Sequence, residues 1–96
     1  MQRHSTYYVY IVQCVNGTYY TGYTSDIAKR IEAHNKGSGA KYLKGKTPVQ
    51  LVYLKEYGYY KNALKEERRI KTFGRKKKEK LIAGYTKNSG FLIHKN

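Results

Sequence analysis

Glu67 is an acidic side chain at a position that the pattern of its segment predicts to be buried. Apolar Ala63 lies four residues before it and Ile70 three residues after it, which is the spacing of one face of an α-helix. A carboxylate on a buried face costs free energy unless it pairs with a cation or binds a metal ion. We therefore expect Glu67 either to hold a metal ion at the base of a cleft or to form an ion pair with Lys71.

Arg30 and His34 form a second group that could do chemistry. They lie four residues apart, beside apolar Ile27 and Ile31, so they share one side of a predicted helix. An arginine can hold a phosphate through two N–H groups, and a histidine can move a proton near neutral pH. Taken alone, the pair is typical of an exposed cationic helix face, but the neighbouring apolar positions favour an orientation toward the rest of the protein.

Tyr10 and Tyr20 stand on either side of a turn signal at residues 16–17. Packing is the usual role of a strand tyrosine, and we expect it for most of the 12 in this chain. A strict two-residue turn would place Tyr10 and Tyr20 on opposite faces, because side chains alternate along a strand. A three-residue loop, with Gly17 in the left-handed conformation, would bring Tyr10 opposite Gly22 and place both tyrosines on one face. A shared site therefore requires the longer loop.

The elements that must position these residues follow from the apolar pattern and the turn residues. The sequence predicts the order ββαβαα, over residues 7–15, 18–24, 25–34, 49–56, 62–73 and 76–83. Ser25 or Thr24 is expected to cap the first helix and Asn62 the second. These elements predict an α/β fold of the α+β type, a small three-stranded, mainly antiparallel sheet flanked by helices. We expect one domain over residues 7–83, an extension over 1–6 and a loosely attached tail over 84–96.

The charge balance narrows the class of partner. Lys and Arg number 20 and Asp and Glu only 6, so the formal net charge is +14 and a polyanion is the expected partner. Six scattered acids disfavour a two-metal centre, which needs several converging carboxylates. The single cysteine excludes an internal disulfide and a multi-cysteine zinc site. Without a long apolar run or a signal-peptide pattern, the sequence predicts a cytoplasmic protein that does not enter membranes.

Two basic segments are expected to contact phosphates. One is the loop over residues 40–48, and the other spans residues 65–80, which hold nine Lys or Arg. A solvated surface is the alternative interpretation, but this density favours sequence-independent contacts with a nucleic-acid backbone. The predicted nucleic-acid-binding residues are Lys41, Lys44, Lys46, Arg68, Lys71, Arg75, Lys76, Lys77 and Lys78.

Taken in order, these residues resemble a GIY-YIG endonuclease domain, of the small stand-alone bacterial type related to the nuclease module of nucleotide-excision repair. The resemblance covers residues 7–83 and is carried by Tyr8-Val9-Tyr10, Tyr20-Thr21-Gly22, Arg30 with His34, the runs 39–42 and 48–53, and Ala63-Leu64 with Glu67 and Ile70-Lys71. Tyr8 stands where the family motif has Gly, and Thr21 stands where it has Ile. Glu79 stands where several relatives place Asn.

The resemblance implies a three-stranded sheet with flanking helices and hydrolysis of phosphodiester bonds with one divalent cation, Mg²⁺ or Mn²⁺. By position, Glu67 resembles the metal ligand, and Arg30 resembles the arginine that steadies the scissile phosphate. His34 matches a residue that often assists proton transfer. Tyr10 and Tyr20 resemble the tyrosines that position or activate the attacking water.

We therefore expect a metal-dependent DNA endonuclease of low sequence specificity, for which single-stranded or branched DNA is a candidate substrate. The sequence leaves the oligomeric state open, with a monomer favoured. DNA repair is the process that the resemblance suggests, and RNA remains an alternative substrate. A non-catalytic nucleic-acid-binding module of the same fold is the second hypothesis. A basic protein bound to ribosomes or to anionic membrane is the third. The intact set of Tyr10, Tyr20, Arg30 and Glu67 favours the first, because a protein that only binds nucleic acid does not need an inward Glu.

Overall fold

A three-stranded sheet forms the centre of the molecule. The computed structural model describes residues 6–37 and 40–94. The strands are β1 (Tyr7–Gln13), β2 (Tyr19–Thr24) and β3 (Gln50–Tyr57). They lie in the order β2-β1-β3, and both neighbouring pairs are antiparallel. β1 is therefore the central strand, and β2 forms one open edge.

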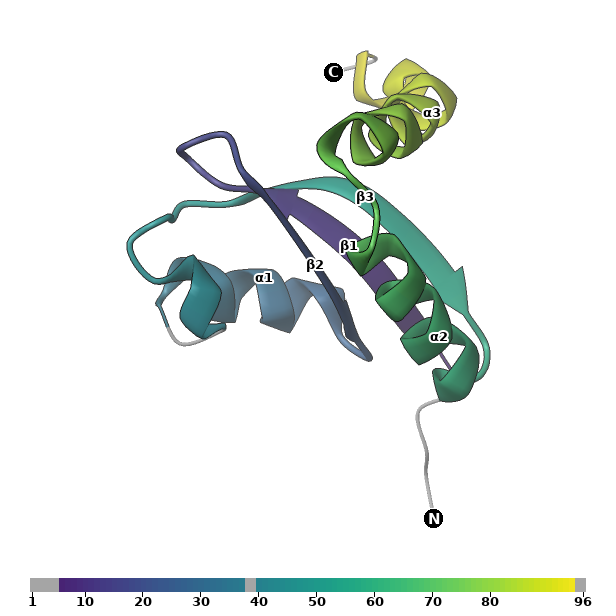
Figure 1. The fold of residues 1–96 in the computed structure, drawn as a ribbon, viewed down its shortest axis with the longest axis horizontal. Helices are drawn as coiled ribbons and strands as arrows, with labels where there is room; N and C mark the ends of the chain where they lie inside the picture. Colours follow the sequence, from purple (N-terminus) through teal and green to yellow (C-terminus); the bar gives the residue numbers. More distant parts are fainter. Residues whose placement is uncertain (1–5, 38–39, 95–96) are drawn as a thin grey trace.

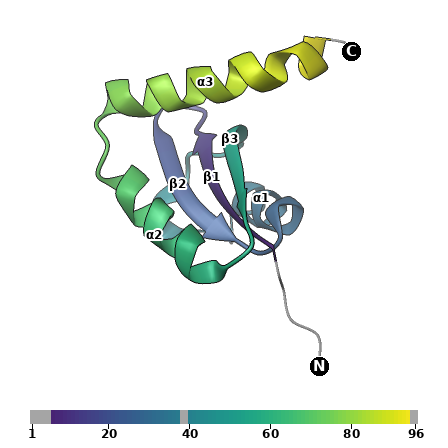
Figure 2. The same ribbon diagram turned by 90° about the vertical axis from the view of Figure 1, so that its right-hand side faces the viewer.

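Helices cover both faces of this sheet. They are α1 (Ile27–Asn35), a short 3-10 turn η1 (Lys41–Leu43), α2 (Tyr60–Lys71) and α3 (Arg75–His94). Figure 1 shows α1 on one side of the sheet and α2 on the other. Figure 2 shows α3 crossing one end of the sheet on the side of α2. The predicted α+β architecture and the order ββαβαα are thus confirmed.

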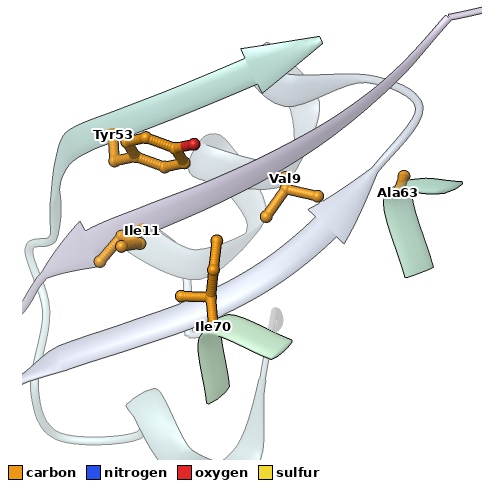
Figure 3. Close-up of a cluster of buried hydrophobic side chains, with 5 residues drawn as sticks. All are labelled: Val9, Ile11, Tyr53, Ala63 and Ile70. Atoms are coloured by element: carbon orange, nitrogen blue, oxygen red, sulfur yellow. The ribbon is translucent and has the colours of Figure 1, made fainter. Parts of the chain in front are cut away.

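The core has two parts, one on each face of the sheet. The first, shown in Figure 3, consists of Val9, Ile11, Tyr53, Ala63 and Ile70. The second consists of Tyr10, Val12, Cys14, Leu43 and Val49. Successive side chains of β1 point to opposite faces, so the middle of this strand is buried on both sides. That double burial explains the uninterrupted apolar run over residues 9–12.

The turn between β1 and β2 has the longer of the two predicted forms. The Cys14 N–H donates to the Thr18 carbonyl at 2.7 Å, and the Gly17 N–H donates to the Cys14 carbonyl at 2.8 Å. Gly17 has φ +91°, the left-handed conformation that glycine adopts without strain. The resulting register places Tyr10 opposite Gly22. Tyr10 and Tyr20 therefore share one face of the sheet.

The predicted helix caps were wrong. Asp26 caps α1, because its Oδ1 accepts the Lys29 N–H at 3.1 Å, whereas the hydroxyl of Thr24 accepts the Asp26 N–H at 3.1 Å. Thr24 is still paired with β1 in the sheet, so the helix begins at Ile27, later than either expected cap would place its start. α2 begins at Tyr60, before Asn62, and has no side-chain cap.

The third helix is longer than predicted. α3 continues through Gly84 to His94, so most of the expected tail is helical. Tyr85 packs edge-on against Tyr53 with ring centroids 5.7 Å apart, which attaches this part of α3 to the core. Gly84 costs the helix only about 1 kcal/mol, which packing of the neighbouring Tyr85 can offset. Residues 1–5 of the expected extension lie outside the described residues. No helix of the described residues is long and apolar enough to cross a membrane.

Candidate active site

A cleft of about 430 Å³ opens at the β2 edge of the sheet. Figure 1 shows β2 passing between α1 and α2, which lie on opposite faces. The residues lining the cleft are Tyr7, Tyr10, Tyr20, Gly22, Tyr23, Thr24, Ser25, Arg30 and Glu67. The structure therefore brings together four of the predicted catalytic residues, one from each of β1, β2, α1 and α2. The fifth, His34, lies behind Tyr10.

Glu67 lies on the buried face of α2, as predicted, between Ala63 and Ile70. Its exposed fraction is only 8%, and it is the one acidic side chain among the described residues lining the cleft. Its Oε2 lies 2.8 Å from the Nζ of Lys71. The predicted ion pair with Lys71 thus forms, and the same carboxylate also faces the cleft.

Arg30 supplies the opposite charge from the other wall of the cleft. Its side chain is half-buried. Within the described part of the chain, its guanidinium has no ion-pair or hydrogen-bond partner. A half-buried arginine without an acid partner is costly in a protein and is typical of a site for an anion. The fork of N–H groups on Arg30 is therefore available to a phosphate.

Tyr10 and His34 form a buried pair at the back of the cleft. Each is about 1% exposed, and a hydrogen bond of 2.8 Å joins the Tyr10 hydroxyl to Nε2 of His34. Burial raises the pKa of Tyr10 well above its ordinary value. Burial, together with the positive charge of Arg30, lowers the pKa of His34. The raised pKa keeps the Tyr10 hydroxyl protonated, and the hydrogen bond to His34 fixes its ring at the back of the cleft.

Gly22 lines the cleft and lies opposite Tyr10, as the longer loop predicted, although it was not among the predicted catalytic residues. A Cβ at this position would lie 2.5 Å from the Tyr10 hydroxyl oxygen and 2.7 Å from Cζ. Only a glycine leaves room for the Tyr10 ring to lie over β2. A glycine inside a predicted strand is a sequence signal for such a close approach.

Tyr20 is the more accessible of the two motif tyrosines. It is half-buried, and the ring of Tyr42 stacks on it with centroids 5.7 Å apart and planes inclined by 21°. Lys46 lies with its Nζ 3.6 Å from the centroid of the Tyr42 ring. His34 contacts Tyr20 edge-on at 5.6 Å. Tyr42 was not among the predicted site residues. The sequence signal that could have identified it is its place in the run 39–42, which is part of the family resemblance.

Family comparison agrees with this geometry. Residues 6–81 match the GIY-YIG catalytic domain. The chain belongs to the GIY-YIG family. It is 56% identical over 77 residues to a UPF0213 protein of Staphylococcus saprophyticus, covering 80% of this chain and 94% of that protein. A UPF0213 protein of Staphylococcus aureus is 51% identical over the same length and coverage.

Two solved structures are similar to this GIY-YIG domain. The solution NMR structure of a UPF0213 protein from Bacillus halodurans is 41% identical, has a TM-score of 0.54, and matches 81% of this chain and 83% of that one. The solution NMR structure of a protein from E. faecalis is 31% identical, has a TM-score of 0.59, and matches 88% of this chain and 91% of that one. The expected family, small stand-alone GIY-YIG proteins, is confirmed. The GIY-YIG domain is a nuclease fold, and it implies a nucleic-acid substrate.

None of the predicted nucleic-acid-binding residues is among the described residues that line the GIY-YIG cleft. Lys71 and Lys78 line a second hollow on the far side of Tyr20, together with Tyr42. Lys41 and Lys44 are exposed in or beside η1, which Figure 1 shows next to α1. Arg68, Lys76 and Lys77 are exposed on α2 and α3.

Arg75, another of the predicted contacts, has several partners in the protein. It donates to the Gly17 carbonyl at 3.2 Å and to Glu79 at 3.0 Å, and it lies 4.6 Å from the centroid of the Tyr19 ring. These contacts join the start of α3 to the turn between β1 and β2. They also give Glu79 a structural role that the sequence did not indicate.

A metal ion at this GIY-YIG site would rely on Glu67. The described residues contain no group of three or more His, Cys, Asp or Glu side chains that could surround an ion. A single carboxylate suits Mg²⁺, which keeps several waters and takes further oxygen ligands from substrate phosphates. Lys71 is about half-exposed, so its ammonium group can move away from the carboxylate. The donor set therefore fits one hard divalent cation.

The pKa of His34 predicts how stability depends on pH. Because burial and Arg30 lower this pKa in the folded state, the unfolded chain, with a pKa of about 6.5, takes up the proton first. The contribution of neutral His34 to the free energy of unfolding is therefore complete above about pH 6.5. As the pH falls through the lower folded pKa this contribution is lost, and the free energy of unfolding decreases by up to about 1.4 kcal/mol per pH unit. Urea unfolding of the wild type and His34→Gln across this range measures the effect. A difference in unfolding free energy that stays constant from about pH 7.5 to about pH 5 would contradict it.

Proposed function

We propose that this chain is a metal-dependent endonuclease that hydrolyses phosphodiester bonds in DNA with low sequence specificity. One observation carries the proposal. A half-buried guanidinium without a partner among the described residues, Arg30, and a buried carboxylate, Glu67, line the same cleft, which a half-buried phenol, Tyr20, also lines. This arrangement suits an anion and a cation held close together, as hydrolysis of a phosphodiester requires.

Arg30 binds the scissile phosphate in this mechanism. Its two N–H groups can donate to two non-bridging oxygens at once and oppose the negative charge that develops during attack. No acid competes for this guanidinium among the described residues, so its charge is directed at the substrate. Tyr20, the accessible phenol, orients the attacking water through its hydroxyl. Tyr10, held by His34, shapes the wall behind it.

Glu67 holds the divalent cation through its carboxylate oxygens. A cation bound there supplies two kinds of chemistry, a lower pKa for an attacking water and neutralisation of the leaving oxygen. Low sequence specificity follows from the surroundings of the cleft, because lysines and arginines that contact phosphates position a nucleic acid without reading its bases.

A non-catalytic binding module is the second candidate, and the Glu67–Lys71 ion pair is the observation that favours it. A carboxylate that only stabilises α2 would keep this pair, with Nζ and Oε2 2.8 Å apart. Such a protein would bind nucleic acid through Arg30 and the basic residues and would cleave nothing. Metal-dependent cleavage therefore distinguishes the two functions.

The purified chain should nick supercoiled plasmid with Mg²⁺ or Mn²⁺, and chelation by EDTA should abolish nicking. Excess Mg²⁺ should restore it, because the protein itself remains folded. A panel of single-stranded, duplex, branched and RNA substrates then ranks the preferred structure. Cleavage that persists in EDTA would disprove the metal dependence. Absence of cleavage with every metal and substrate, alongside tight DNA binding, would establish the binding module.

A further inference from the structure

Two large aromatic side chains at the start of α2 are exposed. Tyr59 is 50% exposed and Tyr60 is 43% exposed. Their rings contact each other with centroids 5.6 Å apart, and Tyr60 also contacts Tyr7 at 6.2 Å. Neither Tyr59 nor Tyr60 belongs to the two core clusters. Adjacent exposed rings that do not serve the core are typical of an interaction surface.

Cations border these rings along the outer face of α2. A hollow of about 370 Å³ is lined by Tyr60, Lys61, Leu64, Lys65 and Arg68. Their spacing places them on one side of the helix, away from the buried face that carries Glu67. We call Tyr59, Tyr60, Lys61, Leu64, Lys65 and Arg68 together the Tyr60 patch.

The cations of the Tyr60 patch have no acidic partner among the described residues. Elsewhere on the same helix, Arg69 pairs with Glu66 at 2.6 Å and Lys71 pairs with Glu67 at 2.8 Å. The patch therefore combines exposed aromatic faces with uncompensated positive charge. A second copy of this chain is a poor occupant, because two surfaces of a protein with a formal charge of +14 repel each other.

Unpaired nucleotides match both properties of the patch. Their bases stack on aromatic rings, while their phosphates pair with lysine and arginine. In a duplex the base faces are already stacked on one another, so Tyr59 and Tyr60 would gain nothing from them. The chemistry of the patch thus selects single-stranded nucleic acid over duplex.

The Tyr60 patch is continuous with the candidate active site. Tyr7 contacts Tyr60 and also lines the cleft. Tyr7 therefore joins the Tyr60 patch to the cleft that Glu67 and Arg30 line.

We infer that the Tyr60 patch binds an unpaired segment of the substrate and leads it into the cleft. The inference deepens the proposed function and rests on it, since it names single-stranded nucleic acid, or a duplex with a single-stranded extension, as the substrate class. Direct binding tests it without cleavage. The full-length Glu67→Gln protein is titrated into a fluorescently labelled oligonucleotide, either single-stranded or as a duplex of the same sequence, and anisotropy is followed.

In that background, the double substitution Tyr59→Leu and Tyr60→Leu should weaken single-strand binding at least about tenfold, because stacking contributes about 1–3 kcal/mol per base. Duplex affinity should change less than about twofold, since the duplex has no free base faces. The matched pair Tyr59→Phe and Tyr60→Phe keeps the rings and should retain single-strand affinity. Photo-crosslinking of a bromouridine-containing strand, located by mass spectrometry, should place the label at the start of α2.

A charge control separates this patch from the general basic surface. Lys65→Gln should weaken single-strand binding more than Lys29→Gln, which removes an equally exposed cation from α1. Equal loss on single strand and duplex in the leucine variant, no loss at all, or no retention in the phenylalanine variant would overturn the inference. Two other results would also overturn it. One is self-association of the protein that the leucine variant abolishes, and the other is binding of an acidic peptide in place of DNA that the same variant abolishes. If the intact chain cleaves nothing but the ring-dependent preference holds, the inference stands and only the proposed hydrolysis fails.

Discussion

Glu67→Gln should reduce cleavage at least about 100-fold while leaving DNA affinity within about twofold of the wild type. The substitution keeps the shape of the side chain and removes the charge that would hold the divalent cation. It also removes the acid partner of Lys71 at 2.8 Å, and the freed ammonium adds attraction for phosphate. Initial rates of plasmid nicking in saturating Mg²⁺, with affinity from anisotropy, measure the two effects separately.

Glu79→Gln is the matched control for this experiment. It removes the same charge from an exposed ion pair with Arg75, and such a pair contributes at most about 1 kcal/mol. Its cleavage rate should stay close to that of the wild type. Nicking by Glu67→Gln at the wild-type rate would remove Glu67 from the mechanism and leave it as the ion-pair partner of Lys71.

Arg30→Gln should lower the cleavage rate about 100-fold, because the guanidinium is the donor positioned to oppose charge on the attacked phosphate. Arg30→Lys should recover only part of this loss, since an ammonium group keeps the charge but not the two-pronged N–H fork. Single-turnover rates at saturating enzyme measure the chemical step without a contribution from weaker binding. Lys29→Gln, an exposed neighbour on α1, is the control for lost positive charge.

A second measurement shows whether Arg30→Gln leaves the site intact. The charge of Arg30 contributes to the lowered pKa of His34, so its removal should raise that pKa toward the ordinary value. The NMR titration of the His34 ring follows this shift in the folded protein. Equal activity of Arg30→Gln and Lys29→Gln, with the expected shift at His34, would show that Arg30 lies near the site but has no part in the reaction.

Local patterns in the sequence were sufficient for the elements and for the direction of Glu67. Positions 63, 67 and 70 share a helix face whatever the rest of the chain does, because the period of the α-helix is constant. The alternation of side chains along β1 likewise depends on the strand alone. The first residues of the helices were harder to predict from the sequence, because a residue such as Thr24 can be either the last residue of a strand or a helix cap. Pairing with β1 decided in favour of the strand.

Contacts between distant residues were not predictable from local patterns. The hydrogen bond from Tyr10 to His34 joins residues 24 apart, and it places His34 behind the cleft wall instead of in the cleft. The stacking of Tyr42 on Tyr20 and the contacts of Arg75 with Gly17 also link separate elements. Each of these contacts depends on how the helices pack on the sheet, and the spacing of residues within one helix or strand does not determine that packing.

The sequence by itself determined the family, the α+β order and a strongly basic surface with one inward acid at Glu67. Spacing along α2 and α3 already allows their ion pairs, whereas only the tertiary structure decided which charges from different elements meet in the cleft. Arg69, Lys71 and Arg75 have acid partners, whereas Arg30 in the cleft and Arg68 in the Tyr60 patch have none among the described residues. The reason is physical, because Coulomb attraction and burial act through distance in space. The composition gives the number of charged residues, and the fold determines their positions relative to one another.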